Sequence, residues 1–339
     1  MVPSQQPDQR GPIVFLVLLL IAGLLVIAWG VGQEDADGAP PVDEAPSAVA
    51  PDGTPPPDDV ETPAPTQEGE PDGPPPEPAA LPDGGTKVFG GGHFLVAYYG
   101  TGQTPTMGVL GETDPDTMHE RLRRAARPFG GPDRPLRHVY ELIVTIADAS
   151  PGPDGDYSHD IPRSVVETYV EAAHRNGALL LLDLQPGRSS FLEAAQRWEW
   201  ALRDPWVGLA LDPEWRMGPR QVPARAIGQV RAAEVNRTSA WLAGLTREAG
   251  LPEKLFVLHQ FRTDMVEDIA EVRHRPGLAM VQHVDGFGTR GQKRSTYAAV
   301  ARPGQFTMGF KLFYDEDVRR MGPAEVGALR PRVRFVSFQ

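Results

Sequence analysis

The sequence of 339 residues contains no cysteine, and its lysines are limited to Lys87, Lys254, Lys293 and Lys311. Without cysteine the chain has no thiol nucleophile, no disulfide and no lipid-modified cysteine at a processed N-terminus. A Gly-x-Ser-x-Gly motif is also missing, which argues against a serine nucleophile of the α/β-hydrolase type. Thiol chemistry is excluded and nucleophilic serine chemistry is not indicated.

Positive charge is absent from one long stretch. Between Gln33 and Thr86 there are fourteen Asp and Glu residues and no Lys or Arg, and Asp8 and Arg10 cancel. Because the formal net charge of the chain is −12, the part from Lys87 onward carries +2. A nearly neutral domain predicts no nucleic-acid surface. The acidic stretch is rich in proline and poor in large apolar residues, so we expect residues 32–87 to form a disordered, extended linker.

One apolar run precedes this linker. Residues from Ile13 to Val31 carry no charge, close to the roughly 20 residues that span a bilayer. Arg10 on one side and Glu34 and Asp35 on the other predict a cytoplasmic tail over 1–12 and an extracytoplasmic C-terminal part. We therefore expect a single-pass anchor in the lipid bilayer at 13–31. A cleaved signal remains the alternative, because Ala28-Trp29-Gly30 resembles a cleavage site.

From residue 88 to 339 apolar runs alternate with amphipathic stretches. We predict strands at 93–100, 138–147, 178–185, 207–214, 255–261, 278–285, 306–314 and 333–339. Helices are expected near 116–128, 162–176, 190–203, 226–249, 264–274, 291–301 and 322–330. Eight strands alternating with seven helices over about 250 residues favour an α/β fold, a (β/α)8 barrel without its last helix. An open doubly wound sheet is less favoured, because Tyr99-Gly100-Thr101-Gly102 lacks the glycine spacing of a nucleotide loop.

The active site of such a barrel lies at the carboxyl ends of its strands. Since alternate strand residues share a face, we expect Asp183, Gln185, Asp212, Glu214, His259, His283, Asp285 and Lys311 to point into the barrel. As further substrate contacts we predict Tyr98, Tyr99, Trp215, Tyr314 and Glu112 near the strand ends or in the loop after the first strand.

Asp212-Pro213-Glu214 is the most informative motif. Two carboxyls on one strand face raise each other's proton affinity. We expect a protonated Glu214 as general acid, an ionised Asp212 as its partner, and Asp183 and Asp285 as further catalytic carboxyls. The aromatic face of Trp215 would stack on a sugar. The structural alternative is that Asp212 caps a loop and Glu214 pairs with Arg216 or Lys311.

The sequence also bears on metal binding and on anion binding. The histidines show no His-x-His or His-x-x-x-His spacing, so we predict no metal and no cofactor, with a metal-dependent hydrolase as an alternative. The basic residues Arg290, Lys293 and Arg294 are predicted to form a solvated helix start, with an anionic polymer as their alternative partner.

Several sequence blocks carry a resemblance. AYYGT, MGVLGE, LDLQPGR, LALDPEWR, VLHQFR and GFKLFYDED resemble a group of uncharacterised exported actinobacterial proteins over residues 93–339. More distantly, the Asp-x-Glu end of the fourth strand is similar to family-18 chitinases and family-25 lysozymes. That resemblance implies that Glu214 is the acid and Asp212 its partner. Ala210 and Val207 stand where the chitinases have further aspartates, and Tyr98 and Tyr99 where the lysozymes have an acid.

The sequence thus predicts a membrane-tethered, extracytoplasmic barrel that resembles glycoside hydrolases and acts on cell-wall or surface polysaccharide. An inactive glycan-binding barrel is the second alternative.

Overall fold

The computed structural model describes residues 79–339 except residue 103, and the predicted anchor and most of the linker lie outside these residues. The compact unit runs from Pro78 to Gln339. It begins earlier than the predicted boundary at residue 88, because Leu81 is buried with Val88 in the barrel interior and Asp83 pairs with Arg137 at 2.7 Å. Within the described part of the chain, no helix is long and apolar enough to cross a membrane.

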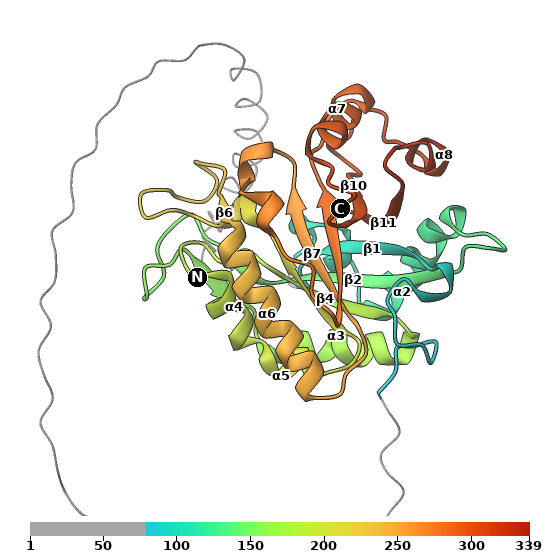
Figure 1. The fold of residues 1–339 in the computed structure, drawn as a ribbon, viewed down its shortest axis with the longest axis horizontal. Helices are drawn as coiled ribbons and strands as arrows, with labels where there is room; N and C mark the ends of the chain where they lie inside the picture. The colour runs from blue at the N-terminus through green and yellow to red at the C-terminus, as the bar shows by residue number, and fades with distance from the viewer. Residues whose placement is uncertain (1–78, 103) are drawn as a thin grey trace, which may run out of the picture. The chain divides into compact units, whose positions relative to one another are not determined.

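Eight parallel strands close into a barrel, as predicted (Figure 1). The strands follow one another in chain order around it, and β1 pairs with both β2 and β11. Their bounds are β1 Phe94–Gly100, β2 Leu136–Ala147, β4 Leu179–Leu184, β5 Val207–Leu211, β7 Lys254–Gln260, β9 Leu278–Val284, β10 Thr307–Leu312 and β11 Val333–Phe338. A short strand, β3 Ser158–Asp160, adds antiparallel to the end of β2.

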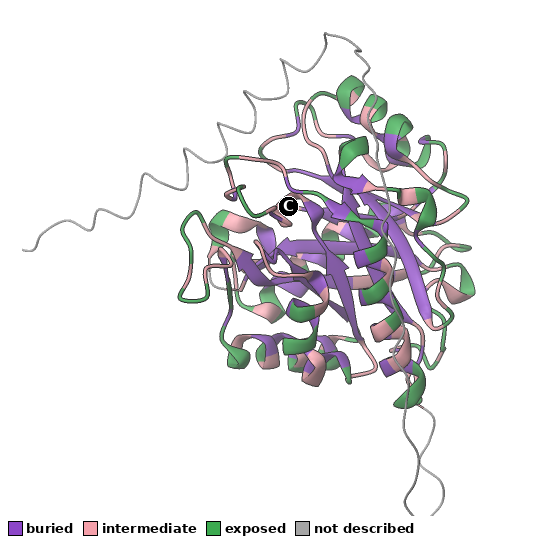
Figure 2. Cartoon of the chain, turned by 60° about the vertical axis from the view of Figure 1, so that its left-hand side comes forward, coloured by how far each residue is buried: buried purple, intermediate pink, exposed green. Residues whose placement is uncertain are grey.

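Helices cover the outside of the barrel, with their exposed faces toward solvent and the strands buried beneath them (Figure 2). They are α2 Pro115–Ala126, α3 Arg163–Asn176, α4 Phe191–Arg197, α5 Glu199–Leu202, α6 Ala232–Glu248, α7 Arg290–Val300 and α8 Pro323–Gly327. Local sequence explains their ends. Ser190 and Thr289 form capping boxes with Glu193 and Gln292, and Gly177 ends α3 in the left-handed region.

The helix predicted over 264–274 was wrong. That segment forms two short 3-10 turns, Thr263–Met265 and Ile269–Glu271, separated by β8 Val266–Glu267. Asp268 takes a left-handed backbone conformation with φ of 56°, which an α-helix does not contain. β8 pairs instead with β6 Val230–Arg231, which lies ahead of α6. This parallel pair was not predicted, because a strand of two residues is too short to show the alternation of apolar and polar residues that marks a strand.

The strand alternation divides the apolar core into two parts. Leu180, Leu182, Leu209 and Leu211 pack in the outer layer between strands and helices. The interior layer includes Leu95, Leu179, Leu181, Ala210, Val257, Val281 and Phe335. The polar strand-end residues lie above this inner apolar layer.

Candidate active site

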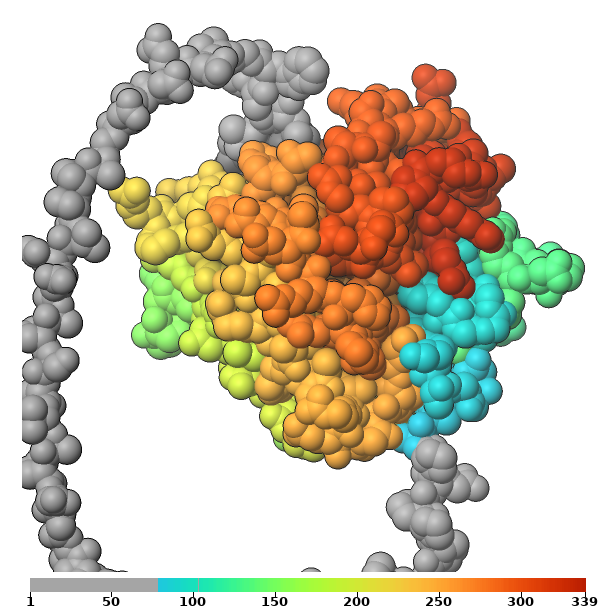
Figure 3. All heavy atoms as spheres, in the orientation of Figure 1, coloured from blue at the N-terminus to red at the C-terminus, as the bar shows by residue number. Residues whose placement is uncertain are grey.

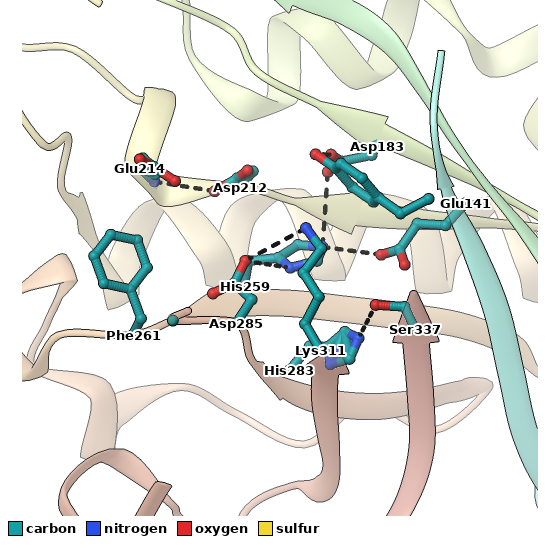
Figure 4. A network of polar contacts seen from close by, with 12 residues as sticks. Glu141, Asp183, Asp212, Glu214, His259, Phe261, His283, Asp285, Lys311 and Ser337 are labelled. Atoms are coloured by element: carbon teal, nitrogen blue, oxygen red, sulfur yellow. Dashed lines mark hydrogen bonds and ion pairs between the residues drawn. The ribbon is translucent and has the colours of Figure 1, made fainter. Parts of the chain in front are cut away.

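Every barrel strand brings a polar side chain to the centre of the carboxyl end (Figure 4). The contributors are Tyr99 from β1, Glu141 from β2, Asp183 from β4, Asp212 after β5, His259 from β7, His283 and Asp285 from β9 and its end, Lys311 from β10 and Ser337 from β11. All nine are buried. The predicted interior positions of Asp183, His259, His283, Asp285 and Lys311 therefore meet in one network.

His259 is the centre of this network. Its Nδ1 donates to Asp285 Oδ2 at 3.0 Å, and its Nε2 lies 3.0 Å from Glu141 Oε1 and 3.9 Å from Asp183 Oδ1. Burial disfavours the imidazolium, but the contacts with Asp285 and Glu141 raise the pKa of His259 well above its usual value. We conclude that His259 is a buried cation held among carboxylates.

Two carboxylates are stabilised by this cation. Burial opposes ionisation of Asp285 and Glu141, yet the close contacts and charge of His259, assisted by Lys311, lower the pKa of both. Lys311 Nζ lies 3.8 Å from Asp285 Oδ2 and 3.4 Å from the ring centroid of Tyr99. Two buried anions thus face two cations.

A second group of residues links β1 to β4. The hydroxyl of Tyr99 donates to Asp183 Oδ2 at 2.8 Å, and Gln185 Nε2 donates to the Tyr99 oxygen at 3.3 Å. Burial raises the pKa of Asp183 to about 6, with the charge of Glu141 adding to the rise and His259 opposing it. Gln185 also accepts from the amide of Ala147 at 3.3 Å, which fixes its orientation.

His283 has a different character from His259. Its Nε2 contacts Ser337 Oγ at 2.8 Å, and its ring stacks on Phe335 at 4.7 Å. Burial, followed by the charge of His259, lowers the pKa of His283 to about 3. It is therefore a neutral hydrogen-bonding group.

The Asp212-Glu214 motif does not lie on a strand, which corrects the prediction. β5 ends at Leu211, and Pro213–Trp215 form a 3-10 turn whose N-cap is Asp212. The Glu214 amide donates to Asp212 Oδ1 at 3.2 Å. Asp212 thus caps a turn, as in the structural alternative. Within the described residues, however, Glu214 has no ion-pair partner within 4.0 Å, and Arg216 pairs with Glu234 at 2.9 Å.

The two carboxyls of this motif also differ from expectation in their protonation. Burial, reinforced by Asp183, Asp285 and Glu214, raises the pKa of Asp212 well above its usual value. Asp212 is therefore protonated, and the ionised carboxylate whose charge acts on Glu214 is Asp285. Burial and then the charge of Asp285 raise the pKa of Glu214 to about 7, against Lys311 and His259. Glu214 is only partly buried, which leaves this acid open to solvent.

Three predicted site residues lie elsewhere. Tyr98 points out of the barrel, where its hydroxyl is 3.3 Å from that of Tyr314. Tyr314 stacks on Phe338 at 5.5 Å, so both tyrosines belong to an outer aromatic cluster. Glu112 forms an ion pair with Arg121 of α2 at 2.5 Å. Trp215 lies in the same turn as Glu214 and is partly exposed.

Glu141 and Ser337 were missed by the sequence analysis. Glu141 is a lone acid in the middle of the apolar run of β2 and is fully buried. A carboxyl at such a position is costly unless it has a partner, which was the available signal. Ser337 carries no such signal, because a serine near a strand end is common.

The network is rich in acceptors. Among the described residues, buried atoms that lack a hydrogen-bond partner include Asp183 Oδ1, Asp285 Oδ1, both Glu141 oxygens and His283 Nδ1. No group of three or more histidine and acidic side chains in the described part has an arrangement suited to a metal ion. What the site offers is a half-buried acid, Glu214, beside a buried, charge-balanced network.

Comparison with known proteins adds no assignment. The chain matches no protein-family model, and it matches no curated protein. The function therefore has to be argued from the geometry.

Proposed function

We propose that the chain is a membrane-tethered, extracytoplasmic, glycoside-hydrolase-like barrel that acts on cell-wall or other surface polysaccharide. One observation carries the proposal: Glu214, with a pKa near 7, lies at the accessible edge of a network in which Asp285 is ionised. A pair of carboxyls with separated pKa values is the arrangement that glycoside hydrolysis requires.

The chemistry follows from the two protonation states. Glu214 donates its proton to the glycosidic oxygen as the bond to the leaving sugar breaks. The sugar carbon then acquires positive charge, which the Asp285 carboxylate stabilises. Water adds to this carbon and passes a proton to the Glu214 carboxylate, which completes the hydrolysis and restores the acid. His259 and Lys311 keep Asp285 ionised and oriented, and Tyr99 holds Asp183.

The catalytic test uses the full chain and purified cell wall, with release of reducing sugar as the readout. We expect Glu214→Gln to reduce the rate by about 100-fold or more. Glu199→Gln, which removes an exposed carboxylate on α5 paired with Arg203, is the matched control and should keep the rate. A Glu214→Gln chain as active as the parent would refute the acid role.

The same experiment separates the alternatives. If the parent chain releases no sugar but sediments with the wall, the barrel is a glycan-binding module. Loss of activity with chelator, together with a fully active Glu214→Gln variant, would favour a metal-dependent hydrolase.

Membrane tethering is the second part of the proposal and rests on the sequence of residues 13–31. A chain that keeps this segment should stay with membranes through an alkaline carbonate wash, and protease added to cells without an outer barrier should remove the barrel. A soluble product that begins near Gln33 would show a cleaved signal instead.

A further inference from the structure

A cavity at the opposite end of the barrel is lined by three arginines. It has a volume of about 240 Å³ and lies beside the first residues of β1 and β11, Phe94 and Val333. Figure 3 shows the two chain regions meeting on one face, the start of the described domain in cyan and its C-terminal part in red. No acidic residue lines the cavity. It is separate from the candidate active site, which occupies the carboxyl ends of the strands.

The arginines come from two loops distant in sequence. Arg134 lies in the loop before β2, and Arg330 and Arg332 lie between α8 and β11. Within the described residues none of the three guanidinium groups has a carboxylate within 4.0 Å. Arg330 Nη1 donates to the carbonyls of Gly327 and Leu329, which orients it.

Not every basic group of the domain lacks a counter-charge. The basic cluster that the sequence analysis singled out is neutralised, since Arg290 pairs with Glu325 at 2.8 Å and Lys293 with Asp317 at 2.9 Å. Three arginines that line one cavity without an acidic residue raise the local positive potential and favour an anion.

The floor of the cavity is apolar and aromatic. Phe94 and Phe129 stack with centroids 5.7 Å apart, and the guanidinium carbon of Arg134 lies 5.2 Å from the Phe94 centroid. The ligand should thus combine an anionic group with a small apolar or flat part. The volume is below the roughly 300 Å³ typical of the smallest sites for drug-sized ligands, which sets the upper size.

We propose that this cavity binds a phosphate monoester. A phosphate monoester carries between −1.5 and −2 charges near neutral pH, and its three terminal oxygens match three guanidinium groups. A carboxylate offers one charge and two oxygens. The site lies outside the proposed catalytic machinery, so it holds independently of the glycosidase proposal.

The test is calorimetric titration of the full chain, kept in a neutral detergent, with phenyl phosphate. We expect one bound ligand per chain and at least about tenfold weaker binding of benzoate. Arg134→Gln and Arg332→Gln should each weaken phenyl phosphate binding by about tenfold. Arg237→Gln removes an exposed arginine of α6 and is the matched control, expected to leave the affinity unchanged. Thermal melts would verify that each variant folds.

Two further ligands identify the source of the phosphate. If glycerol 3-phosphate binds more tightly than dihexanoyl phosphatidic acid, the site binds phosphate and its ligand is a soluble or polymeric polyol phosphate. If dihexanoyl phosphatidic acid binds more tightly, the site binds phosphate and its ligand is a lipid headgroup. The proposal fails if phenyl phosphate does not bind, if benzoate binds equally well, or if both arginine variants bind like the parent chain.

Discussion

His259 Nδ1 lies 3.0 Å from Asp285 Oδ2, in a position where neither side chain is open to solvent. The opposite ring nitrogen faces Glu141 at the same distance. One imidazolium therefore contacts a carboxylate from β2 and a carboxylate from the end of β9, on two sides of the barrel. Because buried carboxylates need such a partner, this relationship links the stability of the domain to the protonation of its candidate site.

Replacing His259 should destabilise the domain strongly. His259→Leu leaves Glu141 and Asp285 buried without their cation, and losing one partner of a buried ion pair costs about 3–5 kcal/mol. Urea unfolding of the variant should show a loss of this size, and adding Glu141→Gln to it should restore part of the stability. His274→Leu, an exposed histidine, is the control. A loss below about 1 kcal/mol would contradict the central role of His259.

The pH dependence of stability should reveal Asp183. Its pKa rises from 3.8 unfolded to about 6 folded, so the folded state binds the proton more tightly. The stability from Asp183 is complete below about pH 4 and is lost as pH rises through 6. The Asp183→Asn variant has no carboxyl to ionise at this position, so it does not lose this stability. The free energy of unfolding of Asp183→Asn relative to that of the parent chain should therefore increase between pH 4 and 7, by about 1–3 kcal/mol.

Comparing denaturant unfolding of the two chains at each pH isolates this group from the others. Asp133→Asn, an exposed aspartate, is the matched control for the lost charge. A difference between parent and Asp183→Asn that stays constant from pH 4 to pH 7 would contradict the raised pKa.

The barrel could be predicted because its strands are short buried runs separated by helical stretches with clear ends. Alternation then placed Asp183, His259 and His283 on the inner face, where the structure has them. The same alternation separates Tyr99 from Tyr98, which face opposite sides of β1. Only one of the two tyrosines can therefore point into the barrel, and the prediction that both contact substrate does not agree with the alternation.

Protonation was beyond sequence reasoning. Asp212 was expected to be ionised because only Glu214 was counted as its neighbour. In the structure Asp183 and Asp285 also approach it, and they come from strands distant in sequence. Glu141 lies in the middle of β2, away from the strand ends where site residues were predicted. The charge state of a buried carboxyl depends on all groups around it, which only the closed barrel brings together.

Lys293 illustrates a further difference between pattern and structure. It was assigned to a solvated helix start, yet it is buried, pairs with Asp317 at 2.9 Å and donates to the carbonyls of Gly286 and Lys311. Lys293→Met should destabilise the domain by about 3–5 kcal/mol, because Asp317 loses its cation. Thermal and urea unfolding would measure this.

Combining Lys293→Met with Asp317→Asn should recover part of the loss, since the uncompensated charge is removed. Arg294→Met on the same helix, where the side chain is exposed, should change the stability by less than about 0.5 kcal/mol. Equal effects of Lys293→Met and Arg294→Met would show that the buried pair contributes nothing.

Gly228 holds the turn that carries Glu214. Its amide donates to the Glu214 carbonyl at 2.6 Å, and an added Cβ would lie 2.5 Å from the Pro213 carbonyl oxygen and 2.6 Å from that of Arg216. Gly228→Ala should displace the turn, lowering sugar release together with the melting temperature. Gly304→Ala, with open space around its added Cβ, is the control. A fully active, fully stable Gly228→Ala chain would show that the turn tolerates displacement.

The acidity of Glu214 should respond in opposite directions to two neighbours. The Asp285 carboxylate raises the pKa of Glu214 and the Lys311 ammonium lowers it. Asp285→Asn should therefore bring the pKa below 7, and Lys311→Met should bring it above 7. Carbon-13 NMR titration of glutamate-labelled chains measures both, with the Glu214 signal assigned by its loss in Glu214→Gln. Each variant removes one buried charge and could disrupt the buried network. In that case the pKa of Glu214 would move toward that of an exposed glutamate in both variants. Opposite shifts of the pKa of Glu214 would show that the charges of Asp285 and Lys311 act on it in the folded barrel.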